Sequence, residues 1–106
     1  MARFDLYSNP AKSRTTTPYL LDVQSDHLGN LESRVVIPVT RVAGNYTASK
    51  VAQDLSPIIV IDGEQFMLET PFLGAFPASQ LGSAVGTLKG EQDRIGAALD
   101  RLFGAY

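Results

Sequence analysis

The residues able to carry catalytic chemistry are few in this chain. His27 is the single histidine and cysteine is absent, so one subunit offers neither a histidine-based metal triad nor a Ser-His-Asp arrangement. Asp22 and Asp26 could form a pair of carboxylates, but a strand-end hydrogen bond and a turn-starting residue are the better interpretation. We therefore expect no catalytic residue, no bound metal and no cofactor.

Length and charge further limit the classes of protein to which this chain can belong. A chain of 106 residues, 44% of them hydrophobic, suits one compact domain spanning residues 1–106. Nine basic against eleven acidic residues give a net charge of −2, which disfavours direct binding of nucleic acid through many phosphate contacts. The absence of cysteines, of a signal peptide and of a run of about 20 apolar residues predicts a soluble, cytoplasmic protein outside any membrane.

Three strands are predicted in the first part of the chain. Residues 4–7 alternate apolar and polar, residues 19–23 form a compact apolar run, and residues 33–40 are rich in β-branched side chains. Prolines and threonines in residues 8–18 predict an exposed loop between the first two strands. Because Pro38 cannot donate a backbone hydrogen bond, we expect it at an edge, a bulge or a strand end.

The clearest local signal is Asp62-Gly63, which stands between two apolar runs at residues 57–61 and 64–68. Asp-Gly favours a type I′ turn because both central residues of that turn need positive φ. We predict a β-hairpin, whose arms are apolar on successive residues and therefore buried on both faces or covered by a partner. Residues 41–55 lack a sustained period, which predicts irregular structure with one helical turn.

The last segment is predicted to be a helix that ends at Gly104. Its apolar residues recur at helical spacing and form one stripe able to dock on a sheet: Ile95, Ala98, Leu99, Leu102 and Phe103. The stripe places Phe103 in the core rather than on a contact surface. Several strands followed by one terminal helix predict an antiparallel α+β domain whose helix covers part of the sheet.

Several motifs follow one another in a recognisable order. They are Tyr19-Leu20-Leu21-Asp22-Val23-Gln24-Ser25-Asp26, Arg34-Val35-Val36-Ile37-Pro38 and Leu55-x-Pro57-Ile58-Ile59-x-Ile61, followed by Pro77, Gly82, Val85, Leu88 and Ile95. Together they resemble the CcdB family of toxins, which poison DNA gyrase. The resemblance implies a β-rich α+β fold of the CcdB/MazF type, a small SH3-like antiparallel barrel with a C-terminal α-helix. It also implies a homodimer, which the apolar hairpin arms and residues 67–73 predict independently.

The resemblance implies a gyrase-binding surface at the helix end and in the loop after Asp26. This surface maps onto His27, Leu28, Asp100, Gly104, Ala105 and Tyr106. Gap-free alignment puts the last three residues where the family has Trp-Gly-Ile, so the tryptophan is missing and Tyr106 is the expected aromatic anchor. A one-residue shift would pair Phe103-Gly104 with Trp-Gly but would move Leu99 and Leu102 off the core stripe. For His27, a plain solvated loop residue is the competing interpretation.

The same resemblance implies an acidic, partly disordered CcdA-like antitoxin as partner. We assign its contact to Tyr7, Asn9, Lys12 and Arg14. The expected function is that of a toxin of a type II toxin–antitoxin system, which binds the gyrase A subunit, traps the cleaved-DNA complex and is not an enzyme. Two alternatives stay open. One is a MazF-like endoribonuclease on the same fold, with Arg14, Arg34 and Arg41 as candidate cations; the other is a non-toxic homologue that only binds an antitoxin.

Overall fold

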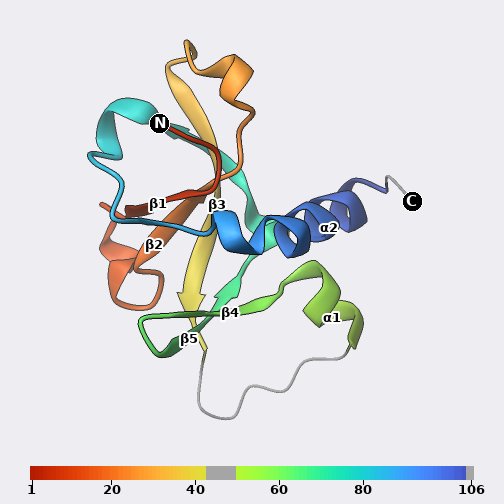
Figure 1. Ribbon diagram of the computed structural model, residues 1–106. Helices are drawn as coiled ribbons and strands as arrows, with labels where there is room; N and C mark the ends of the chain where they lie inside the picture. Colours follow the sequence, from red (N-terminus) through yellow and green to blue (C-terminus); the bar gives the residue numbers. More distant parts are fainter. Residues whose placement is uncertain (43–49, 105–106) are drawn as a thin grey trace.

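One curled antiparallel sheet is the frame of the protein, whose computed structural model describes residues 1–42 and 50–104 (Figure 1). Its strands are β1 (Asp5–Ser8), β2 (Tyr19–Asp22), β3 (Ser33–Arg41), β4 (Ile58–Ile61), β5 (Glu64–Leu68), β6 (Gly74–Pro77) and β7 (Gly86–Thr87). They lie in the order β4-β5-β3-β2-β1-β7, and β6 pairs with β3. The sheet is a half-barrel followed by a C-terminal helix, so the predicted fold class is confirmed, whereas the homodimer stays a prediction.

The long strand β3 holds the sheet together because it has different partners along its two halves. On one side it pairs with β2, and on the other its first half pairs with β6 and its last residues pair with β5. Pro38 lies inside β3, between the residues that pair with β6 and those that pair with β5. Its carbonyl accepts a hydrogen bond from the Glu69 amide at 2.9 Å. Proline is tolerated here because this side of β3 pairs with neither β6 nor β5 at Pro38, so the missing N–H breaks no ladder hydrogen bond.

The predicted hairpin is confirmed as β4 and β5. Asp62 and Gly63 have φ values of +51° and +81°, as a type I′ turn requires, and Ile61 pairs with Glu64 across it. The expected burial of both arm faces is not found within the single chain, because the Val60 side chain is 63% exposed.

Two hydrophobic clusters lie on opposite faces of the sheet, as the alternation of side chains along each strand requires. The larger cluster includes Leu6, Leu21, Ile37, Val39, Phe66, Leu68 and Ile95. The smaller cluster contains Tyr7, Leu20, Val36 and Leu81, with Phe76 packed against it. Successive residues such as Leu6 and Tyr7 therefore belong to different clusters, and the part of the sheet formed by β1, β2 and β3 is covered on both faces.

Helix α2 (Gln92–Phe103) supplies one wall of the larger cluster. Ile95 and Ala98 are fully buried, and Gly104 ends the helix with a φ of +71°, a left-handed conformation that glycine adopts without strain. The helix and its end are as predicted. The prediction that Phe103 belongs to the core is wrong, because its side chain is 69% exposed where the helix runs past the sheet.

Short helical segments connect the strands. Helix α1 (Lys50–Leu55) packs against α2 and provides the helical turn expected within residues 41–55, of which residues 43–49 lie outside the described ranges. The 3-10 turns are η1 (Lys12–Thr15), η2 (Asp26–Leu28), η3 (Thr70–Phe72), η4 (Ala78–Gln80) and η5 (Lys89–Glu91). Within residues 1–42 and 50–104, no helix has the length and apolar character that a membrane crossing requires.

Candidate functional site

A buried ion pair fixes the end of β2 against β3. The Arg34 Nε donates to Asp22 Oδ2 at 2.8 Å, Arg34 Nη2 lies 2.6 Å from the same oxygen, and the two side chains are 1% and 0% exposed. Burial raises the pKa of Asp22, while the hydrogen bonds from Arg34 and from the Gln24 amide act in the opposite direction. Arg34 Nη1 has no hydrogen-bond partner among the described residues. The pair therefore positions the chain that follows Asp22 and is closed to solvent.

Gln24 connects turn η2 to strand β3 through two side-chain hydrogen bonds. Its Nε2 donates to the Leu28 carbonyl at 2.9 Å, and its Oε1 accepts from the Val35 amide at 3.1 Å. Ser25 precedes the turn as its N-cap and accepts from the His27 amide at 3.2 Å. These side chains hold η2 in one conformation and leave the His27 and Leu28 side chains exposed, with Leu28 at 50%.

Arg3 lies between η2 and the end of α2. Its backbone amide donates to Asp26 Oδ1 at 2.8 Å, and its Nε donates to the Val23 carbonyl at 3.1 Å. The guanidinium stands 4.8 Å from the centre of the Phe4 ring, within the range of a cation–π contact. Phe4 has a φ of +74°, which is unusual for a bulky residue, and its ring is buried in the larger cluster. The N-terminus is therefore bound to the same part of the molecule as η2.

Arg3 also lines a small pocket beside the end of α2. The pocket has a volume of about 310 Å³ and is lined by Arg3, Val23, Val35, Leu73, Leu99 and Phe103. Phe103 at its rim is 69% exposed, and Phe72, in the turn η3 that contacts α2, is 72% exposed. We call this pocket and the exposed Arg3 and Phe103 at its rim the helix-end surface. Exposed aromatic and apolar groups beside a shallow pocket are typical of a protein-binding surface.

A sequence model of the family described as CcdB protein matches residues 3–104. The chain belongs to the CcdB family. The match includes both the Asp22 to Asp26 motif and α2, so the elements that build the helix-end surface lie within the matched part.

The CcdB-family chain also resembles a solved structure, an endoribonuclease in complex with its cognate antitoxin from a mycobacterial species. The TM-score is 0.75 at 12% sequence identity, and the match covers 100% of this chain and 97% of the other. At this identity the likeness shows a shared fold. It also corrects one expectation: the lack of a familiar catalytic motif predicts no enzymatic activity, but an endoribonuclease has the same fold. The prediction that the chain is not an enzyme therefore does not stand.

The structure describes four of the six residues assigned to gyrase binding. His27, Leu28 and Asp100 are exposed, and Gly104 is the C-cap of α2. Ala105 and Tyr106 lie outside the described residues. Sequence reasoning missed Arg3, Phe72 and Phe103 as surface residues. Only the one-residue shift in the tail alignment, which pairs Phe103-Gly104 with the family's Trp-Gly, pointed to an aromatic side chain at this place.

The residues assigned to antitoxin binding divide into buried and exposed ones. Tyr7 is 1% exposed and belongs to the smaller cluster, and Asn9 is 5% exposed. The Asn9 Nδ2 donates to the Thr17 carbonyl at 2.8 Å and to Ser13 Oγ at 3.1 Å, so this side chain organises the loop around η1. Burial removes Tyr7 and Asn9 from the accessible contacts. Lys12 and Arg14 remain exposed on η1.

The three arginines considered for RNA binding differ in burial and in pairing. Arg34 is buried in its ion pair, and Arg41 pairs with Glu64 and donates to the Thr15 carbonyl. Arg14 is the one of the three that is exposed without an ion pair in the described structure. Among the residues described, no three histidine or acidic side chains gather closely enough to hold a metal ion.

Proposed function

We propose that this chain is the toxin of a toxin–antitoxin pair and that it binds the DNA gyrase A subunit through the helix-end surface, trapping the cleaved-DNA complex. The observation that carries the proposal is the exposed Phe103 at the end of α2, in a member of the CcdB family. An exposed aromatic ring beside a pocket supplies the kind of anchor that dominates protein interfaces. Leu28, held by Gln24, adds a second apolar contact. A gyrase target implies action in the cytoplasm.

The proposed antitoxin is an acidic, partly disordered segment that contacts Lys12 and Arg14. Both side chains are exposed, and neither forms an ion pair among the described residues. Two free positive charges on one turn attract an acidic chain and accelerate its association. The structural neighbour is bound to its cognate antitoxin, which supports an antitoxin as the partner. The proposal includes one domain over residues 1–106 and a homodimer as the working form.

A second candidate function is endoribonuclease activity, which the shared fold of the mycobacterial structure favours. Exposed cations are needed to hold an RNA backbone, and a group of suitable pKa is needed to activate the ribose hydroxyl. Arg14 and Lys12 are the exposed cations on one turn that such a site would use.

Two parallel assays on one preparation of the protein distinguish the candidate functions. The protein is added to gyrase from its own host with supercoiled plasmid, and in parallel to a long RNA. Trapped double-strand breaks or lost supercoiling at micromolar protein are expected. Site-specific RNA cleavage with unaffected gyrase would instead establish the second function. If neither occurs and overexpression does not arrest growth, the toxin proposal fails, and a non-toxic antitoxin binder is left.

A further inference from the structure

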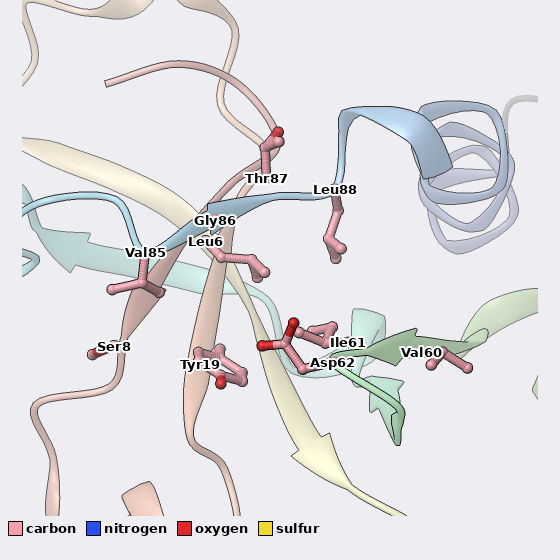
Figure 2. Close-up of a pocket in the computed structure, with 10 residues that line it drawn as sticks. All are labelled: Leu6, Ser8, Tyr19, Val60, Ile61, Asp62, Val85, Gly86, Thr87 and Leu88. Carbon is pink, nitrogen blue, oxygen red and sulfur yellow. The ribbon is translucent and has the colours of Figure 1, made fainter.

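The half-barrel is open along one side, which leaves a groove between its two edge strands. One wall is β4 and its turn, and the other is β7, and neither edge pairs with the other. The groove has a volume of about 510 Å³, within the range of ligand-binding clefts. Figure 2 shows Leu6 and Leu88 directed into this space, with Ile61 and Asp62 on the opposite wall.

Backbone groups of both edges are directed toward the gap. Because Ile61 pairs with Glu64 across the two-residue turn, Ile61 hydrogen-bonds to β5 and the neighbouring Val60 N–H and C=O point away from β5. On the other wall, the Leu88 amide donates to the Phe4 carbonyl at 2.8 Å, so the Thr87 backbone points away from β1. Unpaired backbone groups on edge strands are templates for an added strand.

The side chains of the groove specify what such a strand would carry. Leu6 and Leu88 are 2% and 7% exposed and make an apolar floor. Asp62 at the mouth is exposed, and in the described part of the chain its carboxylate has no hydrogen-bond or ion-pair partner. The nearby Arg41 is already paired with Glu64. The groove therefore combines an apolar floor with one uncompensated negative charge.

We propose that this groove binds an extended peptide segment of a partner protein, which adds a strand between β4 and β7. The segment has apolar side chains at alternate positions and a Lys or Arg beside Asp62. Repulsion from Asp62 disfavours an acidic segment relative to a basic one. A second copy of the chain, paired strand to strand through β4, would use one edge only and would leave the β7 edge uncovered. The site is separate from the helix-end surface and does not depend on gyrase binding.

The test is selection of a random dodecapeptide library on the wild-type protein, with Val60→Pro as the counter-selection target. Proline at this edge position removes the N–H that faces the groove and breaks no hydrogen bond to β5. Enrichment of peptides with alternating β-branched residues and one Lys or Arg is expected. Equal recovery on both proteins, or no enrichment on the wild type, overturns the proposal.

Two further measurements keep the test informative if Val60→Pro folds poorly. The best peptide is remade in two registers, with N-methyl groups at one or the other set of alternate residues. A strand inserted between β4 and β7 uses both sets of N–H groups, so binding should fall more than tenfold in each register. Asp62→Asn keeps a favourable Asn-Gly turn and removes the charge, so affinity should fall about two- to fivefold. Full affinity in either N-methylated register, or tighter binding of an acidic peptide, refutes a strand added between β4 and β7. Light scattering that shows a dimer lost on peptide binding would assign the groove to a second copy and also refute it.

Discussion

Phe103→Ala gives the most direct test of the helix-end surface, because this side chain should contribute little to the stability of the fold and much to the affinity for gyrase. The side chain is 69% exposed, so folding covers only about a third of it. Since full burial of a phenylalanine is worth about 1.5 to 3 kcal/mol, truncation should lower the free energy of unfolding by about 0.5 to 1 kcal/mol. An aromatic anchor at an interface typically contributes about 2 kcal/mol or more, so affinity for gyrase should fall about 30-fold.

The assay pairs thermal unfolding with a titration of gyrase inhibition. Phe103→Ala should lower Tm by less than about 8 °C and raise the concentration needed for inhibition by about 30-fold. Phe103→Tyr keeps the ring and should behave like the wild type. Ile95→Ala, at a fully buried position, should cost about 2 to 5 kcal/mol of stability through cavity formation. If Phe103→Ala destabilises as much as Ile95→Ala, or inhibits gyrase as well as the wild type, the anchor assignment is wrong.

Further predictions concern the residues that position η2. Arg34→Ala should lower the free energy of unfolding by about 3 to 5 kcal/mol in urea titrations, because it leaves the buried Asp22 charge unpaired; a loss below about 1 kcal/mol would contradict this. Because burial raises the pKa of Asp22 above its unfolded value, the stability of the wild type relative to Asp22→Asn should fall as pH rises from about 4. A relative gain with pH would show that the attraction of Arg34 outweighs burial. Gln24→Ala should cost about 1 to 3 kcal/mol and speed hydrogen exchange at the Val35 amide, which loses its acceptor; unchanged exchange would refute the role of Gln24.

Elements with strong local signals could be predicted from the sequence. Asp62-Gly63 specifies a turn that few other residue pairs accept, and the apolar stripe through Ile95 and Ala98 fixes which face of α2 is buried. The end of the helix at Gly104 follows from its left-handed backbone. In each case the interactions that decide the structure lie within a few residues along the chain.

Features that depend on distant parts of the chain could not be predicted. Strand β7 is two residues long and exists because β1 provides its partner. Phe103 continues the helical stripe, but its burial depends on whether the sheet extends beneath it, and it does not. Asp22 and Arg34 each stand out in the sequence, yet their pairing depends on the register of β2 with β3.

The Asp22 to Asp26 motif, which points most strongly to the family, consists largely of residues that position others. Asp22 binds a buried guanidinium, Gln24 joins η2 to β3, and Ser25 caps η2. Such a motif can be shared among proteins with different targets, because it specifies where the loop and the helix end stand. Under the proposed function, the exposed side chains at those places, Leu28 and Phe103 here, decide what is bound. A family match over residues 3–104 therefore supports a shared fold and shared positioning residues. Substitutions at the exposed positions test which protein is bound.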